Sequence, residues 1–303
     1  MFPFQQVVFV GALAAIAASS SAQSPTGAWN PSYGAPVSIQ SVNTGFGNST
    51  SGSATAANGS ELDAAYSYLS GNTLNLLLTG NLESFNKLVL FIDNGSGSGQ
   101  NVITGGAGLP GQYSGFTFDS GFGATHYIIS NGGGSPFAYY VDAGNLVAGQ
   151  GGYVGSNGGQ GALGGGSYAS GLIQAAINNS NVAGVDGNPS GPLVDPLTAQ
   201  FGMEFAIDLS WLNLAAGATS IRITAFINGS AHDYASNQFL GGLPAGTGNL
   251  GGNGSGTYTG NLSGINLNNF AGNQFFTVAV PAPGAVGLLA FAGILAGGRR
   301  RQA

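Results

Sequence analysis

The hydrophobic positions of this chain fall in short runs, separated by turns rich in glycine, asparagine and serine. No run keeps a 3.6-residue period over the roughly ten residues that a helix needs. β-Branched and aromatic residues are frequent in most of the runs, as is typical of strands. The strands that this pattern predicts are Ala64–Leu69, Thr73–Thr79, Lys87–Ile92, Thr125–Ser130, Phe137–Val141, Leu172–Asn178, Met203–Leu209, Ser220–Ile227 and Gln274–Val280.

Two features of this pattern are informative about local structure. Ala64–Leu69 and Thr73–Thr79 flank Ser70-Gly71-Asn72, whose glycine and asparagine tolerate positive φ, so these runs predict a β-hairpin. Lys87–Ile92 is continuously apolar after its lysine and ends at Asp93-Asn94-Gly95. We therefore expect this strand to be buried on both faces or to lie inside a sandwich.

Roughly nine or ten strands without intervening helices predict an all-β fold, a single antiparallel β-sandwich of jelly-roll-like form. We assign this domain to residues 61–280, after a polar segment, 23–60, that holds a candidate first strand. Gly149–Gly166 has ten glycines and Gly241–Gly260 has nine. Because glycine loses much entropy on ordering, we expect both stretches to be mobile surface loops.

The amino end predicts export. Val7–Ala18 is a short apolar run, and small residues follow it up to Ala22. This arrangement is typical of a secretory signal peptide, here residues 1–22 forming a helix that signal peptidase removes before Gln23. The secretion machinery and signal peptidase are therefore expected partners.

The carboxyl end, residues 281–303, predicts a hydrophobic helix that anchors or sorts the chain. The apolar stretch Gly284–Gly298 lies between two prolines, Pro281 and Pro283, and the basic triplet Arg299-Arg300-Arg301. It is short for a hydrocarbon core that normally asks for about 20 residues, which suits a transient anchor. By the positive-inside rule the arginines stay in the cytoplasm, and everything upstream lies outside.

The tail resembles the PEP-CTERM sorting signal of Gram-negative bacteria, whose usual motif is Val-Pro-Glu-Pro before the helix and an arginine cluster after it. Here the motif is Val280-Pro281-Ala282-Pro283, with Ala282 in the place of the glutamate. The resemblance implies processing by an exosortase-like enzyme and a location in the cell envelope, at the cell surface or outside the cell. Until it is processed, the tail would hold the chain in the inner membrane. The alternative is a single-span anchor that is never cut.

Part of the middle resembles the β-sandwich group that includes DOMON domains and family-nine carbohydrate-binding modules. The resemblance rests on the order of Ala65–Leu69, Leu74–Leu78, Leu88–Asp93 and Glu204–Leu209, with a short helical turn at Ser210-Trp211-Leu212. It implies a sandwich fold and binding of a sugar or haem. Members stack sugar rings on a pair of tryptophans, whereas Trp29 and Trp211 of this chain do not align with such a pair.

Composition and charge exclude several classes of protein. Between Gln23 and Val280, Lys87 and Arg222 oppose all eleven acidic residues, a formal charge of 2 − 11 = −9. Such a chain repels phosphate backbones, so we expect no nucleic-acid partner. The absence of cysteine excludes disulfides, thiolate metal sites and cysteine nucleophiles.

No catalytic or cofactor-binding set emerges from the motifs, and we predict that the protein is not an enzyme. The Gly-x-Gly-x-x-Gly matches at 106–111 and 246–251 have no helix after them to hold a pyrophosphate. No Gly-x-Ser-x-Gly elbow is present. His126 and His232 are the candidate imidazole bases, but a sheet residue and a turn residue are the favoured interpretations.

Calcium is the one cofactor for which the sequence offers candidates. Asp93, at the end of a predicted strand, begins an oxygen-rich turn, and Asp119 and Asp142 follow in later segments. Oxygen ligands from separate loops suit a hard cation such as calcium. Asp93-Asn94-Gly95 as a simple turn is the competing interpretation.

These observations leave three functional hypotheses. The first is an exported, non-enzymatic structural or adhesive protein that belongs to an extracellular polysaccharide matrix. The second is a carbohydrate-binding module. The third is a hydrolase that uses two carboxylates in one cleft, which requires carboxyl groups about 5 to 10 Å apart.

Overall fold

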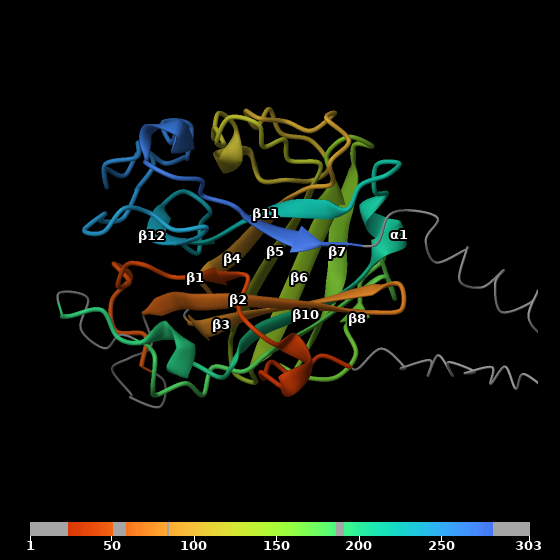
Figure 1. Ribbon diagram of the computed structural model, residues 1–303, viewed down its shortest axis with the longest axis horizontal. Coiled ribbons are helices and arrows are strands. Elements are labelled where there is room, and N and C mark those ends of the chain that lie inside the picture. The colour runs from red at the N-terminus through yellow and green to blue at the C-terminus, as the bar shows by residue number, and fades with distance from the viewer. Residues whose placement is uncertain (1–23, 51–58, 84, 186–190, 281–303) are drawn as a thin grey trace, which may run out of the picture.

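The computed structural model describes residues 24–50, 59–83, 85–185 and 191–280 (Figure 1). In this part of the chain, 13 strands form two antiparallel sheets, and the one α-helix, α1 (Leu209–Leu212), is a single turn. The predicted all-β sandwich is therefore confirmed. The predicted signal peptide and the tail after Val280 lie outside the described residues.

The smaller sheet has five strands in the order β1-β2-β3-β10-β9. Its strands are β1 (Ser38–Ile39), β2 (Ser60–Ser70), β3 (Thr73–Leu82), β10 (Gly202–Asp208) and β9 (Ile173–Ile177). The predicted hairpin is the β2–β3 pair, and Gly71 in its turn has a φ of 59°. The β1 strand is the one that segment 23–60 was expected to hold.

The larger sheet has eight strands in the order β12-β11-β4-β5-β6-β7-β8, and β13 pairs with β11 beside β12. Its strands are β4 (Lys87–Asp93), β5 (His126–Gly133), β6 (Ala138–Asn145), β7 (Gln150–Asn157), β8 (Gly164–Gly165), β11 (Ser220–Asn228), β12 (Ala235–Leu240) and β13 (Phe276–Ala279). Short 3-10 turns punctuate the loops at η1 (Pro31–Tyr33), η2 (Gly111–Tyr113), η3 (Pro196–Thr198) and η4 (Leu267–Asn269).

Each of the nine predicted strands overlaps an observed one, but the expectation that Gly149–Gly166 is a mobile loop is wrong. Much of this stretch forms β7 and β8. Its glycines serve close backbone approach: a Cβ on Gly151 would lie far inside contact distance of the Ala107 carbonyl oxygen. Gly241–Gly260 forms no strand, yet its Leu243 and Leu250 are buried and hold it against the sheet.

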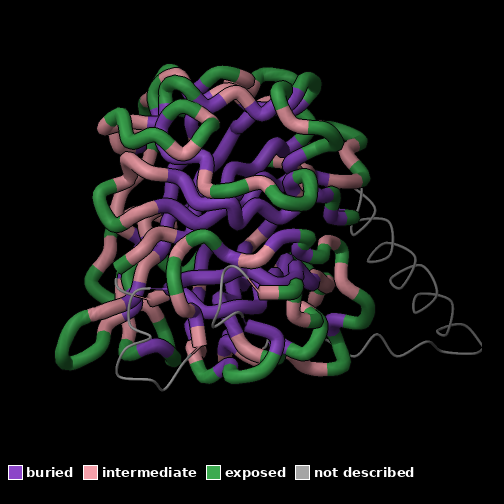
Figure 2. Tube along the Cα trace, turned by 90° about the vertical axis from the view of Figure 1, so that its left-hand side faces the viewer, coloured by how far each residue is buried: buried purple, intermediate pink, exposed green. Residues whose placement is uncertain are grey.

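The larger sheet is buried on both faces at its centre, along β4. Leu88, Leu90 and Ile92 of β4 point into the main core between the two sheets. Val89 and Phe91 point to the other face, where a second core forms beneath loops that contribute residues such as Phe116 and Leu250. This arrangement explains the uninterrupted apolar run of β4, since both faces of a doubly covered strand must be apolar. Figure 2 shows buried residues throughout the interior and exposed residues mainly in the outer loops.

The amino-terminal segment packs on the outer face of the smaller sheet. Glu204, buried on β10, accepts hydrogen bonds from the backbone N–H groups of Thr26 and Gly27 at 2.6 and 2.8 Å. Its other oxygen accepts a 2.6 Å hydrogen bond from the Tyr33 hydroxyl. Tyr33 in turn packs edge-on against Tyr68. A buried carboxylate with several donors is well satisfied, so it fixes this segment on the sheet.

A β-bulge in β2 leaves one acid unusually placed. The register of β2 against β3 shifts between Leu62 and Ala65, and within this bulge Asp63 is 1% exposed. Its Oδ2 has no hydrogen-bond partner. Burial, followed by the nearby Glu61, raises the pKa of Asp63 well above its usual range. A buried carboxyl is cheaper to hold in its neutral, protonated form.

We predict that Asp63→Asn stabilises the protein at neutral pH. The pKa of Asp63 is higher in the folded protein than in the unfolded chain, where it is 3.8. The contribution of Asp63 to the free energy of unfolding is therefore fully present below pH 3.8 and is lost as pH rises through the folded-state pKa. The variant should gain at least about 1 kcal/mol in unfolding free energy at pH 7, because one pKa unit is worth about 1.4 kcal/mol.

Denaturant titrations from pH 4 to pH 7 test this prediction, and the gain should shrink toward pH 4. Asp195→Asn is the control, since Asp195 is an exposed cap of η3 that asparagine replaces well. A gain for Asp63→Asn that does not change with pH would contradict a protonated Asp63.

Candidate functional site

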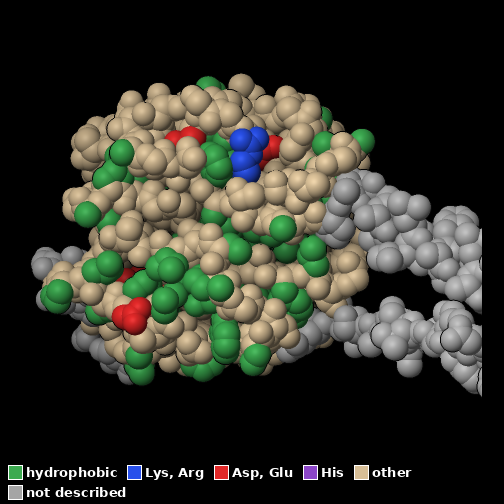
Figure 3. Space-filling model, viewed as in Figure 1, with side chains coloured by type: hydrophobic (Ala, Val, Ile, Leu, Met, Phe, Trp, Pro, Cys, Tyr) green, Lys and Arg blue, Asp and Glu red, His purple; other side chains and the backbone are tan. Residues whose placement is uncertain are grey.

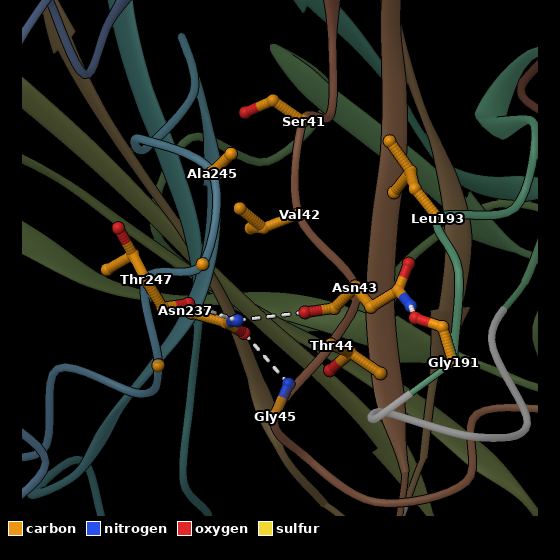
Figure 4. A pocket seen from close by; sticks show the side chains of 12 residues that line it. Ser41, Val42, Asn43, Thr44, Gly45, Gly191, Leu193, Asn237, Ala245 and Thr247 are labelled. Carbon is orange, nitrogen blue, oxygen red and sulfur yellow. Dashed lines mark hydrogen bonds between the residues drawn. The ribbon is translucent and has the colours of Figure 1, made fainter.

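The first candidate site is a cavity of about 390 Å³ that we name the asparagine pocket (Figure 4). Its walls come from the segment after β1, from β12, and from two loops of the sandwich. Those walls contain Ser41–Gly45, Asn237, Ala245–Gly248, Gly191 and Leu193. A volume of this size falls within the range of small-molecule sites, about 300 to 1,000 Å³.

Asn237 is the residue that joins the walls of the asparagine pocket. Its amide nitrogen donates to the carbonyl oxygens of Asn43 and Thr247 at 2.8 and 2.9 Å. Its amide oxygen accepts from the backbone N–H of Gly45 at 2.8 Å. Asn237 is 4% exposed, so these bonds are shielded from water. One amide on β12 thus fixes two other segments of the wall, 41–45 and the loop of Thr247, around the cavity (Figure 4).

Asn43 carries an unsatisfied acceptor in the wall of this pocket. Its amide nitrogen donates to the Gly191 carbonyl oxygen at 2.8 Å, but its buried Oδ1 has no hydrogen-bond partner. Figure 4 shows this amide on the side of the pocket that Leu193 borders. A buried acceptor without a partner costs free energy that a bound hydroxyl or N–H group would recover.

The asparagine pocket is uncharged. Its twelve lining residues are amides, hydroxyls, glycines and small apolar residues. Figure 3 shows charged side chains at only a few points on the face that it displays. Without a cation or a carboxylate in its lining, the pocket offers hydrogen bonds and apolar contacts to a neutral ligand.

A second cavity, which we name the aromatic groove, lies beside the β5–β6 hairpin. It measures about 420 Å³ and contains Phe137, Gln160, Asn178 and Asn179 in its lining. The Phe137 ring is 41% exposed, which suits stacking on an apolar ligand face. Asn179, however, exchanges two hydrogen bonds with the Leu82 backbone, and Gln160 donates to the Thr26 carbonyl. The side-chain amides of Asn179 and Gln160 are therefore already engaged in hydrogen bonds within the protein.

The three candidate calcium ligands have separate roles. Asp93 forms a 2.6 Å ion pair with Arg222 and accepts from the N–H groups of Gly95 and Gly123. Asp119 accepts from the N–H of Gln274 at 2.7 Å. Asp142 lies on β6, and burial raises its pKa. In the described ranges, no three His, Asp or Glu side chains gather as a metal site.

The two histidines are buried in different surroundings. His126 is 1% exposed, its Nδ1 lies 3.0 Å from the Thr125 hydroxyl, and its ring packs edge-on against Trp211. It borders a cavity of about 140 Å³. His232 is half-buried with a φ of 66°, and its Nδ1 lies 3.0 Å from the Tyr113 hydroxyl. No carboxylate hydrogen-bonds to either ring in this part of the chain, so neither forms a catalytic pair.

Several sequence-predicted positions lie outside the described residues. They are the cleavage residues Ala22 and Gln23 and the tail residues Pro281, Ala282, Pro283, Arg299, Arg300 and Arg301. Val280 is described, and its N–H donates to the Thr219 carbonyl oxygen at 2.9 Å. No helix within the described ranges has the length and apolarity to cross a membrane.

The two tryptophans do not form a pair. Trp29 packs edge-on against Tyr66 on the smaller sheet, whereas Trp211 belongs to the main core.

Sequence reasoning missed the asparagine pocket because its residues lie in loops and in β12, which has an Ala-Ser-Asn-Gln-Phe-Leu sequence. The one available signal was the density of asparagine, which is spread over the whole chain.

Comparison with known proteins gives no family for this chain: no protein-family model, curated protein or solved structure matches it significantly.

We predict that both imidazoles stay neutral far below the usual histidine range. Burial lowers the pKa of His126 and of His232 to about 4 each. Because both native values lie below the unfolded value of 6.5, the stability they contribute is lost as pH falls from 6.5 toward 4. NMR titration of the ring protons should give midpoints near 4, and midpoints of 6 to 7 would contradict the buried placement.

Proposed function

We propose that this chain is an exported, non-enzymatic adhesive protein that holds a neutral polysaccharide in the asparagine pocket. The observation that carries the proposal is an uncharged cavity of about 390 Å³ whose wall contains the buried, unpaired Oδ1 of Asn43. The hydroxyl oxygens of Ser41 and Thr247 can accept hydrogen bonds from a sugar, and a small shift of the Asn43 amide would expose its buried Oδ1 to a sugar hydroxyl.

The absence of charge from the pocket lining favours binding over catalysis. Hydrolysis of a glycosidic bond normally uses two carboxyl groups on either side of the bond. No acidic residue lines the asparagine pocket, the aromatic groove or the cavity beside His126. Glu61 and Asp63, which are neighbours on β2, are each 1% exposed and line none of these cavities. The hydrolase hypothesis has no support from these sites.

Neutral polymers are favoured over acidic ones by the charges of the whole domain. Lys87 and Arg222 are the basic side chains of the described part of the chain, and neither lines the pocket. Arg222 is also neutralised by Asp93. A uronic acid polymer would meet a net negative surface without a compensating cation, which disfavours its approach.

Binding to the pocket is tested with immobilised neutral glucans and with alginate as the acidic counterpart. We expect retention on a neutral polymer, and Asn43→Ala should weaken it about tenfold, a loss of about 1.4 kcal/mol. Asn178→Ala in the aromatic groove is the matched control and should bind as the parent does. Preferential retention on alginate, or equal binding by both variants, would contradict the proposal.

Export is a separate part of the proposal and rests on the two terminal segments. Expressed at full length in a Gram-negative host, the protein should leave the cytoplasm with Gln23 as its first residue. Replacing Arg299, Arg300 and Arg301 with alanine should impair sorting without changing that first residue. Amino-terminal sequencing and cell fractionation measure both results, and an intact first residue in the cytoplasm would rule out export.

A further inference from the structure

The last strand of the larger sheet, β13, has a free edge. Its partner is β11, and in their antiparallel register Ser220 faces Ala279 and the Val280 N–H donates to the Thr219 carbonyl oxygen at 2.9 Å. Antiparallel strands bond through alternate residue pairs. Val280 therefore bonds to β11, whereas the N–H and C=O groups of Ala279, one residue earlier, point away from it. By the same alternation, those of Thr277 also point away.

The backbone groups at this edge are unpaired. Among the described residues, no hydrogen bond takes up the outward N–H and C=O groups of Thr277 and Ala279, and both residues are exposed. β13 is the blue arrow in Figure 1 and lies at the front of the view. A row of unpaired backbone groups at a sheet edge is a template on which another strand can pair.

The edge lacks the features that usually prevent such pairing. Natural edge strands are protected by charged side chains, prolines or bulges. Residues 274–280 contain no charged residue and no proline, and β13 pairs with β11 without a bulge. The first proline, Pro281, follows the strand. β13 is therefore open to the addition of a strand.

The strand that matches this edge is β13 of a second copy. When two copies meet antiparallel with Val278 opposite Val278, Thr277 of each copy faces Ala279 of the other. Both residues present their N–H and C=O groups at the edge, so the two facing pairs can exchange four hydrogen bonds. Their side chains are small and uncharged, so the seam brings no like charges together. The edge is thus complementary to itself, as a two-fold interface requires.

Exposed apolar side chains beside the edge can enlarge the contact. Val37 and Ile39, on either side of Ser38, are 36% and 44% exposed. The Ser38 hydroxyl accepts from the Gly241 N–H at 2.9 Å, and a Cβ on Gly241 would clash with the backbone nitrogen of Phe275. β1 therefore lies beside the start of β13. A second copy on this side of the domain would cover apolar surface as well as backbone groups.

We propose that two copies of this chain associate through β13, so that their larger sheets join into one continuous sheet. In this register Val280 of each copy lies opposite Phe276 of the other. The two Val280 residues are then about 14 Å apart along the strands, at about 3.4 Å per residue. The two carboxyl ends therefore leave the dimer close together and can be attached to one surface. The asparagine pocket takes no residue from β13, so this proposal does not depend on ligand binding.

Engineered cysteines test the register, because the chain has no cysteine of its own. Directly opposed residues of a hydrogen-bonded pair have Cα atoms about 5.5 Å apart, which suits a disulfide. Full-length Thr277→Cys and Ala279→Cys chains, expressed together and oxidised, should form a covalent dimer. Either chain alone should give at least about tenfold less, because identical residues of the two copies are only diagonal neighbours.

Non-reducing electrophoresis measures the covalent dimer, and peptide mass spectrometry identifies the bond between residues 277 and 279. Absence of the covalent dimer from the mixed chains would overturn the proposal. Equal amounts from the mixture and from each chain alone would overturn it too, since they indicate random collision.

Removal of one edge N–H tests the dimer without an engineered bond. Ala279→Pro deletes an N–H that β11 does not use, so the fold should persist, but the dimer loses one hydrogen bond per copy. Sedimentation of the full-length chain in detergent should give twice the chain mass for the parent and for Ala279→Ser, which keeps the N–H. Ala279→Pro should sediment at the single mass with an unchanged far-UV circular dichroism spectrum. A parent of single mass, or a dimeric Ala279→Pro, would contradict association through β13.

Discussion

Buried side-chain amides hold the loops of this protein onto its two sheets. Asn181 donates to the backbone carbonyls of Gly80 and Phe201 and accepts from the N–H groups of Gln200 and Phe201. Asn101 donates to three carbonyl oxygens of one loop between 118 and 122. An amide supplies both donors and an acceptor without a charge that must be desolvated, so it satisfies loop backbone at low cost. A glycine-rich chain with few ions depends on this device.

The same device links the two sheets. The N–H of Leu62, next to the bulge in β2, donates to the side-chain oxygen of Gln238 on β12 at 3.1 Å. Gln238 also donates to the Val42 carbonyl oxygen, next to the asparagine pocket. The fold and the candidate site are therefore built from one type of interaction. Three buried amides keep an unpaired atom, Asn43, Asn75 and Gln274, and of these Asn43 is the one in the lining of the asparagine pocket.

The sequence was informative where side chains determine structure and uninformative where backbone does. The nine predicted strands were recognisable because apolar side chains must cover both cores, as at Lys87–Ile92. β7 and β12 were not predicted because glycine and polar residues make up much of their sequences. Pairing with the neighbouring strands, and not their own residue types, makes the strand conformation favourable there. The asparagine pocket was equally hidden, since Asn43 and Asn237 are distant in sequence and meet through tertiary structure. Of the acids proposed as calcium ligands, Asp93 ends β4 as expected, but Arg222 and backbone N–H groups already bond its carboxylate.

The two ends of the described chain lie on the same side of the domain. In Figure 1 the described chain starts and stops on the right, with its last residues near α1, whereas β12 and the segment after β1 lie on the left. Attachment through the carboxyl end would consequently leave the asparagine pocket on the side of the domain opposite the point of tethering. Crowded side by side on a surface, many copies would present their pockets as one outward layer, so that a single long polymer could engage several of them at once and gain avidity from weak individual contacts.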